Sequence, residues 1–216
     1  MNNRDHLHIA DAYSAVHRLS DGTMAHLRLL RPDDGDWVLA GFADLGEESR
    51  YRRFFTAMPR LPDTVLRQLL DVDGWNHLAI AAEAAVEPPA APAPFGIARF
   101  IRLEENPDTA EAAVAVVDHM QGRGLGKLLL SVLAAAAQER GIKKFRGEVL
   151  TSNDAMRALL RELDQHLEPL AVDGTTAIYD VALPESTAPE PVTGPLLDFL
   201  KTAARGVELR LRRLLR

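Results

Sequence analysis

The chain has 216 residues, of which 47% are hydrophobic and 26% are charged, with a formal net charge of −6. This composition is typical of a soluble globular domain, and the negative charge argues against general nucleic-acid binding. The sequence contains no cysteine, which excludes disulfides, thiol nucleophiles and cysteine-based metal sites. It also contains no apolar signal segment and no apolar run long enough to cross a membrane, so we expect a cytoplasmic protein.

The first part of the chain predicts one strand followed by three short helices. Residues 1–23 are polar, and their three histidines fit no metal-ligand spacing, so we expect a flexible N-terminal arm and no metal site. Residues 25–31 predict a strand, and the aspartate pair Asp33 and Asp34 before an apolar-periodic segment is a helix N-cap signal. The three helices are expected at residues 37–42, 46–55 and 63–72.

The middle of the chain predicts the centre of a sheet and one long helix. The segment 83–94 is rich in alanine and proline, which cannot pair inside a sheet, so it predicts a loop. The helix predicted over residues 125–140 is amphipathic, with Gly141 in the C-terminal capping position. Strands are expected at residues 78–82, 95–102, 110–117 and 144–150.

The last part of the domain predicts a second helix over residues 155–163 and a hairpin. Two strands, 166–172 and 175–183, are joined by an Asp-Gly turn, which is a hairpin signal. These elements together predict an α/β (α+β) domain over residues 24–183. We expect a mixed, mostly antiparallel sheet of six or seven strands with helices on both faces.

Residues 121–126, with the sequence Gln-Gly-Arg-Gly-Leu-Gly, lie between the apolar strand and the long helix. Their glycines allow a ligand to approach the backbone closely, and a helix start offers free N–H groups and a partial positive charge. This combination suits a pyrophosphate. The glycine spacing differs from that of the dinucleotide fingerprint, and a P-loop would have Ser or Thr in place of Leu128. A plain helix-capping turn is the alternative interpretation.

The pattern Gln-x-x-Gly-x-Gly, after a strand that carries a glutamate, resembles the acetyl-CoA loop of the GNAT acyltransferase superfamily. The order of the predicted elements also matches the GNAT fold over residues 24–183. The resemblance implies acetyl-CoA as cosubstrate and no metal. It implies that the backbone of Val116 and Val117 pairs with the pantetheine arm and that Asn153 contacts it, although Asn153 also suits a helix N-cap. The remaining cosubstrate-binding residues that it implies are Gln121, Gly122, Arg123, Gly124, Leu125, Gly126 and Lys127.

Glu111, at the start of the strand 110–117, is the candidate general base. In many GNAT enzymes a glutamate at this position activates the acceptor amine, which is almost fully protonated at neutral pH when it is a lysine. We expect the apolar strand to raise the pKa of the Glu111 carboxyl, which suits a base. Glu104 and Glu105, in a polar turn, and Glu148, in the next strand, are rival candidates.

The proton donor for the leaving thiolate has no clear candidate in the sequence. GNAT enzymes often carry a tyrosine in or just after the last helix, and residues 155–163 contain none. Tyr179 lies in the last predicted strand, where we expect it to pack. Protonation of the thiolate by water is therefore the interpretation that stays open.

Residues 28–34 (RLLRPDD) followed by residues 48–55 (ESRYRRFF) resemble the bacterial Pat-type protein lysine acetyltransferases. This resemblance implies transfer of acetyl to lysine side chains of proteins by direct attack of the amine on the thioester. Two alternatives stay open: acetylation of a small-molecule amine or a protein N-terminus, and a non-catalytic acyl-CoA-binding regulatory module. Other members carry a fused cyclic-nucleotide-binding or acyl-CoA-synthetase-like domain, and we expect no such domain in 216 residues.

The C-terminal part has a different composition from the body. Residues 184–195 form a Pro-rich linker, and residues 196–216 predict a basic amphipathic helix. Six Lys or Arg and two acidic residues give residues 195–216 a charge of +4, which leaves −10 for the rest. Three interpretations stay open: the helix lies on an anionic membrane surface, it packs on the acidic body or a second subunit, or it has no dedicated role.

Overall fold

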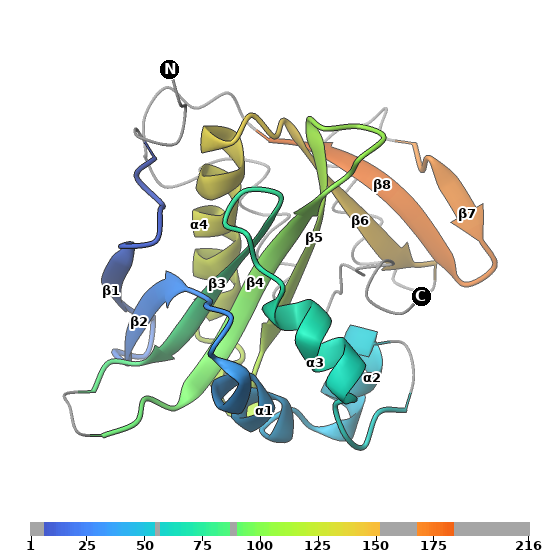
Figure 1. The fold of residues 1–216 in the computed structure, drawn as a ribbon. Helices are drawn as coiled ribbons and strands as arrows, with labels where there is room; N and C mark the ends of the chain where they lie inside the picture. Colours follow the sequence, from blue (N-terminus) through green and yellow to red (C-terminus); the bar gives the residue numbers. More distant parts are fainter. Residues whose placement is uncertain (1–6, 55–56, 87–89, 152–167, 184–216) are drawn as a thin grey trace.

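The computed structural model describes residues 7–54, 57–86, 90–151 and 168–183 (Figure 1). Asn153, the predicted helix 155–163, the linker 184–195 and the predicted helix 196–216 lie outside the described residues. Within the described ranges, no helix is both long and apolar enough to span a bilayer.

One sheet of eight strands forms the centre of the molecule, in the order β1-β2-β3-β4-β5-β6-β8-β7. All neighbouring strands are antiparallel except β5 and β6, which are parallel. This confirms the predicted mixed, mostly antiparallel sheet, with one more strand than expected. The strands are β1 (Ser14–Arg18), β2 (Met24–Leu29), β3 (His77–Ala84), β4 (Pro94–Arg102), β5 (Thr109–Val116), β6 (Lys144–Leu150), β7 (Ala171–Asp173) and β8 (Thr176–Ala182).

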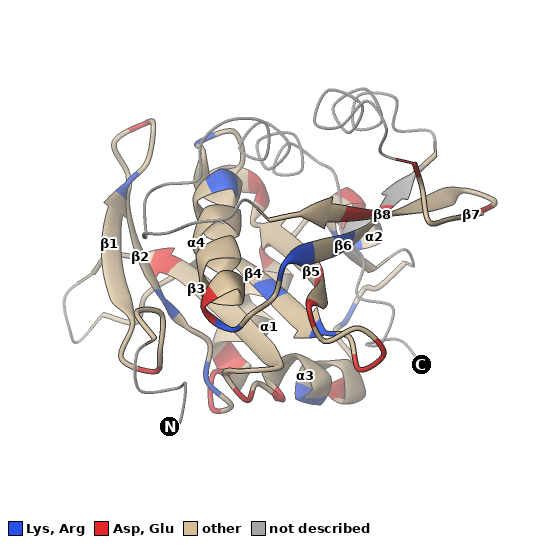
Figure 2. Ribbon diagram, turned by 90° about the horizontal axis from the view of Figure 1, so that it is seen from above, with Lys and Arg blue, Asp and Glu red and all other residues tan. Residues whose placement is uncertain are grey.

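Helices cover both faces of the sheet, as predicted (Figure 1). The long helix α4 (Leu125–Glu139) packs on one face, while α1 (Gly35–Ala43), α2 (Glu47–Phe54) and α3 (Asp63–Leu70) lie on the other. Between Lys127 and Glu139, helix α4 carries no charged residue on any of its sides, as the tan colour in Figure 2 shows. Its inward side is fully buried, so apolar packing holds the middle of the helix against the sheet.

The additional strand, β1, lies in the segment that we expected to be a flexible arm. Ser14–Arg18 pairs antiparallel with β2 along its whole length, so the prediction for residues 1–23 is wrong over this range. The strand is at the edge of the sheet, and Val16 is exposed. Because backbone hydrogen bonds rather than burial of side chains attach β1, hydrophobic patterning did not reveal it.

Strand register decides which side chains share a face. Gly96 in β4 lies against α4, because a Cβ at this position would be 3.2 Å from Leu129 Cδ1. Alternate residues of a strand point to opposite faces, and directly paired residues of neighbouring strands share a face. The face toward α1 and α3 therefore carries Ile97, Arg99 and Ile101 of β4 and their partners Ala115, Ala113 and Glu111 of β5.

Candidate active site

The site begins where two central strands separate. β5 and β6 pair only through Thr109–Glu111 and Lys144–Arg146, although β5 continues to Val116 and β6 to Leu150. Figure 1 shows the two strands side by side near the top of the view and spreading apart below. One edge of β5 therefore lies along an opening in the sheet.

The backbone orientation of β5 determines which groups face this opening. The N–H of Val117 donates to the Phe95 carbonyl at 3.0 Å, so it points toward β4. Because N–H directions alternate along a strand, those of Val114 and Val116 point the other way, into the opening. The backbone edge of β5 at Val116 can therefore bind an extended ligand. The N–H of Val117 is instead hydrogen-bonded to β4, so it does not fit the expected pairing of Val117 with the pantetheine arm.

Gln121 connects this edge to α2 and to the α1–α2 connection. Its Nε2 donates to the Val116 carbonyl at 3.1 Å and lies 3.3 Å from Asp118 Oδ1 and 3.4 Å from Ser49 Oγ. Asp118 in turn accepts a hydrogen bond from the Gly46 N–H at 3.1 Å, and a side chain on Gly46 would collide with its carboxylate. The loop after β5 and the α1–α2 connection are therefore held together at the opening.

The glycine loop has the geometry expected of an anion-binding turn. Gly122 and Gly124 have φ of +75° and +84°, and no atom lies within 4 Å of the position that a Cβ would take on either. Gly124 caps α4 without a side-chain hydrogen bond, and the first turn carries no acidic residue. Since Leu128 donates to the Gly124 carbonyl at 3.1 Å, the three preceding N–H groups, of Leu125, Gly126 and Lys127, have no partner inside the helix.

The two basic side chains of the loop differ in their surroundings. Arg123 forms an ion pair with Asp21 in the β1–β2 turn, and its carbonyl accepts from Ser20 Oγ at 3.0 Å. Hydrogen bonds from the Thr23 backbone and from Arg123 hold the pKa of the Asp21 carboxyl below its usual value. The Arg123 charge is thus directed to the hairpin rather than to a phosphate. Lys127 is in none of the ion pairs found among the described residues, so its charge is available to a ligand.

Glu111 is buried, with 9% of its surface exposed, on the sheet face toward α1 and α3. In the parallel pairing of β5 with β6, Glu111 lies opposite Arg146. On β4, Arg99 lies on the same face, opposite the residue two positions after Glu111. The residues that follow Glu111 on β5 are apolar, as predicted, but Arg146 on β6 and Arg99 on β4 add charges to the same face. The charged neighbours come from strands that are distant in sequence, and a pattern read along one strand does not contain them.

The rival carboxylates are placed differently. Glu148 is 3% exposed and shares the face of Glu111, because it follows Arg146 by two residues on β6. Glu104 and Glu105 are exposed in the β4–β5 turn. The structure thus brings Glu111 and Glu148 to the base of the opening and leaves the two turn residues at the surface. Tyr179 is buried in the core, which confirms that it packs.

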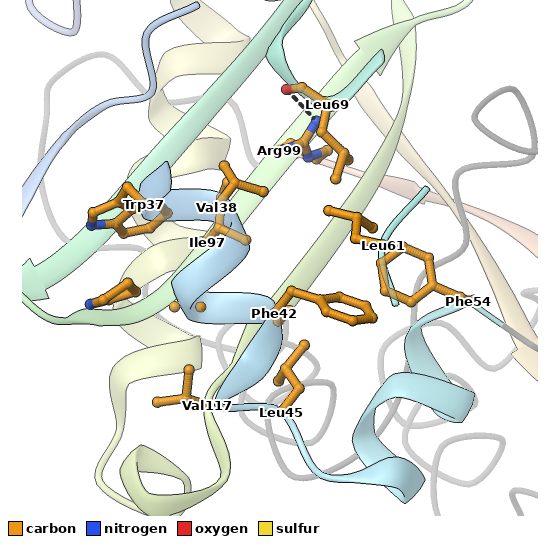
Figure 3. A pocket seen from close by; sticks show the side chains of 14 residues that line it. Trp37, Val38, Phe42, Leu45, Phe54, Leu61, Leu69, Ile97, Arg99 and Val117 are labelled. Atoms are coloured by element: carbon orange, nitrogen blue, oxygen red, sulfur yellow. Dashed lines mark hydrogen bonds between the residues drawn. The ribbon is translucent and has the colours of Figure 1, made fainter. Parts of the chain in front are cut away.

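An apolar pocket of about 60 Å³ lies on the same face, between the sheet and the α1–α3 helices (Figure 3). Ile97 and Ala115 are only partly buried, although their neighbours on both strands are buried, because the pocket opens over them. The pocket lies in the row of side chains that leads to Glu111. Its lining is Trp37, Val38, Gly41, Phe42, Leu45, Phe54, Leu61, Leu69, Pro94, Gly96, Ile97, Arg99, Ala115 and Val117.

Arg99 is the charged residue of this pocket, and only 2% of it is exposed. Its Nη1 donates to the Leu69 carbonyl at 3.0 Å and contacts His77 Nε2 at 3.1 Å (Figure 3 shows the contact with Leu69). Burial, together with the Arg99 charge, lowers the pKa of His77 to about 4, so a neutral His77 accepts from Arg99. Sequence patterning missed this role, because an arginine between two isoleucines looks like a solvent-facing strand residue.

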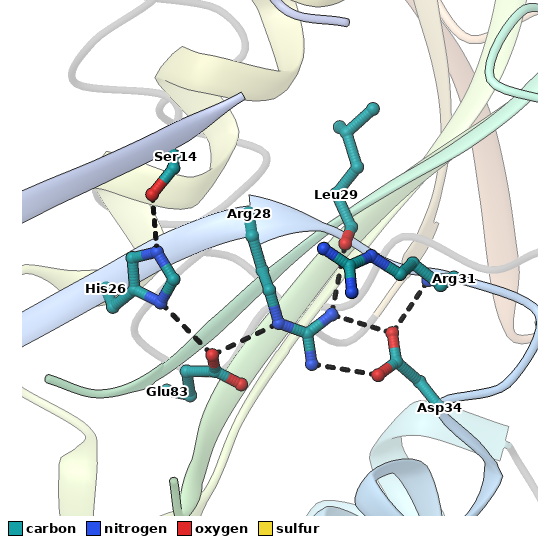
Figure 4. A network of polar contacts seen from close by, with 7 residues as sticks. All are labelled: Ser14, His26, Arg28, Leu29, Arg31, Asp34 and Glu83. Atoms are coloured by element: carbon teal, nitrogen blue, oxygen red, sulfur yellow. Dashed lines mark hydrogen bonds and ion pairs between the residues drawn. The ribbon is translucent and has the colours of Figure 1, made fainter. Parts of the chain in front are cut away.

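A polar network fixes α1, one wall of the pocket, to the sheet (Figure 4). Arg28 donates to Asp34 at 2.7 and 2.9 Å and to Glu83 at 3.1 Å. Glu83 also contacts His26 at 3.1 Å, and His26 contacts Ser14 of β1 at 2.8 Å. Asp34 occupies the N-cap position of α1 but makes no side-chain capping bond, because its carboxylate binds Arg28 instead.

These features define a class of protein. A mixed sheet with one parallel strand pair that separates, and a glycine turn leading into an uncapped helix, agree with the GNAT fold that the sequence resembles. Residues 76–164 match the model of the Acetyltransferase (GNAT) family. This central part of the chain is therefore similar to a GNAT acetyltransferase domain.

Individual relatives agree with this assignment. The chain is 34% identical to acetyltransferase Pat of Mycolicibacterium smegmatis over 143 residues, which are 66% of this chain and 41% of that protein. It is 28% identical to an acetyltransferase of Pseudomonas aeruginosa over 168 residues, covering 78% of this chain and 89% of that one. The match thus spans less than half of the mycobacterial protein.

Among solved structures, the fold is similar to the crystal structure of the GNAT domain of S. lividans PAT. The TM-score is 0.65 with 28% sequence identity, covering 79% of this chain and 97% of that one. The similarity thus spans nearly the whole of that domain.

Proposed function

We propose that this domain transfers the acetyl group of acetyl-CoA to lysine side chains of proteins. The observation that carries the proposal is the buried Glu111 carboxylate at the base of the opening between β5 and β6. The similarity to Pat proteins supports a protein lysine as acceptor. Acetyl-CoA supplies the activated acyl group as a thioester.

The described residues fit the parts of this cosubstrate. The N–H groups at the start of α4 and the Lys127 ammonium suit the pyrophosphate, because both offer positive charge in an open turn. The edge of β5 at Val114 and Val116 suits the amides of the pantetheine arm, which can extend it as a short strand. The acceptor then approaches from the side of α1 and α3, where the apolar pocket opens.

The chemistry assigns one task to Glu111. A lysine ammonium must lose a proton before it can attack, and the Glu111 carboxylate accepts that proton directly or through one water. The neutral amine nitrogen then forms a bond to the carbonyl carbon and loses its second proton to water, while the carbon–sulfur bond breaks. A thiolate is a weaker base than an amine, since the ordinary pKa is about 8.5 for a cysteine thiol and about 10.4 for a lysine, so the CoA thiolate leaves with the electron pair and takes a proton from water.

The test is release of CoA thiol from acetyl-CoA by the purified protein, with a soluble proteome and a panel of small amines offered separately. New acetyl-lysines, located by mass spectrometry, would support the proposal. Release with small amines alone would replace the protein acceptor by a small-molecule amine. Measurable acetyl-CoA binding without any release would favour a non-catalytic acyl-CoA-binding module.

A further inference from the structure

Three polar residues on neighbouring strands form a chain of hydrogen bonds that the proposed acetyl transfer does not use (Figure 4). The Oγ of Ser14 on β1 lies 2.8 Å from His26 Nε2, and His26 Nδ1 lies 3.1 Å from Glu83 Oε1. His26 on β2 pairs directly with Val16 on β1 and with Glu83 on β3. Because Ser14 precedes Val16 by two residues, the three polar side chains share one face of the sheet.

The carboxylate determines which nitrogen of His26 carries the proton. An ionised carboxylate only accepts hydrogen bonds, so His26 Nδ1 donates to Glu83. In the neutral imidazole, Nε2 then has no proton and accepts from the Ser14 hydroxyl. This order of hydroxyl, imidazole and carboxylate is the one in which a histidine removes the proton of a serine nucleophile.

The charges around His26 favour its protonated form during such a step. Arg28 Nε donates to the same Glu83 oxygen at 3.1 Å and keeps the carboxylate ionised, while Asp34 accepts from Arg28 at 2.7 and 2.9 Å. Two carboxylates and one guanidinium leave one negative charge while His26 is neutral. When His26 accepts a proton, this charge is compensated, so the imidazolium is stabilised.

The hydroxyl of this group is accessible from solvent. Ser14 is exposed, and β1 is the edge strand among the described strands. The Leu19 N–H donates to the Thr23 carbonyl at 2.8 Å, so it points toward β2. Because N–H directions alternate along a strand, those of Ser14 and Val16 point away from β2, where they can donate to the oxygen of a carbonyl that Ser14 attacks.

We propose that Ser14 and His26, oriented by Glu83, form a second catalytic site that hydrolyses small activated carboxylic esters. The Ser14 oxygen bonds to the ester carbonyl carbon while His26 Nε2 takes its proton. The bond from this carbon to the alcohol oxygen breaks, and the alcohol leaves with the proton from His26. Water then bonds to the acyl carbon and gives a proton to His26, and the acid leaves as Ser14 recovers its proton. Glu83 touches no reacting atom and is a positioning residue.

The test is labelling of the full chain with a fluorophosphonate, which bonds to activated serine hydroxyls and releases fluoride. Intact-mass measurement and peptide mapping locate the adduct. We expect an adduct on Ser14 and none on the exposed Ser20, whose hydroxyl donates to the Arg123 carbonyl at 3.0 Å rather than to a histidine. His26→Gln should slow labelling about a hundredfold, because it removes the general base. Release of nitrophenolate from nitrophenyl acetate should fall in parallel.

His17→Gln is the matched control for His26→Gln. His17 lies in β1 at an odd number of positions from Ser14, so it points to the opposite face of the sheet, and its substitution should leave the labelling rate unchanged. Ser14→Ala, at an exposed edge position, should keep the melting temperature and lose the adduct. Glu83→Gln keeps an acceptor for His26 Nδ1 but removes the charge. In the folded variant, labelling should slow about tenfold, because the imidazolium loses its counter-charge.

Two results would overturn this inference. One is a folded wild type without an adduct on Ser14, and the other is an adduct on Ser14 that forms as fast in His26→Gln as in the wild type. In either case the three residues only attach β1 to the sheet. Neither result affects the proposed function, because the assay contains no acetyl-CoA and three strands separate β1 from β5.

Discussion

The two ends of β5 differ in the kind of group that they present to a substrate. At the C-terminal end, the groups that we propose to face the cosubstrate belong to the backbone: the edge of the strand, the glycine loop and the N–H groups that open α4. At the N-terminal end, these groups are charged side chains, namely Glu111 and its charged neighbours on adjacent strands. The first end depends on backbone conformation and the second on charge placement. Mutation should therefore separate cosubstrate affinity from turnover.

The largest effect is expected from Glu111→Gln, which keeps the shape of the side chain but removes the base. We expect kcat to fall about a thousandfold, within the range of general-base catalysis, while the Kd for acetyl-CoA stays the same. Steady-state kinetics and calorimetric titration measure the two quantities. Glu104→Gln, in the exposed turn, is the control and should keep full activity. Retained turnover in Glu111→Gln would transfer the role of base to another group, with Glu148 the next to test.

The buried Arg99–His77 pair, near the N-terminal end of β5, can be tested through the pH dependence of the free energy of unfolding. His77 has a folded-state pKa of about 4, below its ordinary value of about 6.5. The unfolded chain therefore binds more protons between these values, and the free energy of unfolding falls as the pH decreases from 6.5 to 4, by up to about 3 kcal/mol. His77→Gln should flatten this dependence in urea titrations, whereas substitution of the exposed His119 should not. An equally steep slope in His77→Gln would contradict a neutral buried histidine.

A smaller effect is expected at the backbone end from Gly124→Ala. A side chain at φ of +84° costs roughly 1 kcal/mol, and the loop can relieve this strain by leaving the conformation that offers its N–H groups, so we expect the Kd for acetyl-CoA to rise about fivefold with little change in kcat. Gly141→Ala is a matched control, because Gly141 ends α4 with φ of +76° and similarly open surroundings. It should cost similar stability and leave the Kd unchanged. Equal effects of both substitutions on the Kd would show that the loop acts only as a helix cap.

The smallest effect distinguishes the two basic residues of the loop. Lys127→Gln should raise the KM for acetyl-CoA about threefold, less so at high salt, because an exposed charge is screened. Arg123→Gln should change the KM less, since its charge is paired with Asp21. Measuring both at low and high ionic strength tests this order. A larger effect of Arg123→Gln would indicate that this side chain leaves Asp21 when the cosubstrate binds.

Several residues show how far sequence reasoning reached into the site. The positive φ of Gly122 and Gly124 and the start of α4 at Leu125 follow the local pattern, as do most strand ranges. Sequence reasoning did not predict the partners of Arg123 and Val117. Arg123 forms an ion pair with the β1–β2 turn, and the N–H of Val117 donates to β4, both of which are distant in sequence. The roles assigned to the cosubstrate-binding residues remain predictions, and Asn153 lies outside the described residues.

The sequence by itself determined the order of the elements, the glycine turn and the position of a carboxylate at the start of β5. These depend on hydrophobic period, turn chemistry and helix capping, which act over a few residues. Only the tertiary structure decided that β1 joins the sheet, that Arg99 is buried beside His77, and that Arg146, which is bound to Asp180, is in register with Glu111. Such contacts join residues far apart in the chain, and their strength depends on burial and on the neighbouring charges, which no local pattern specifies.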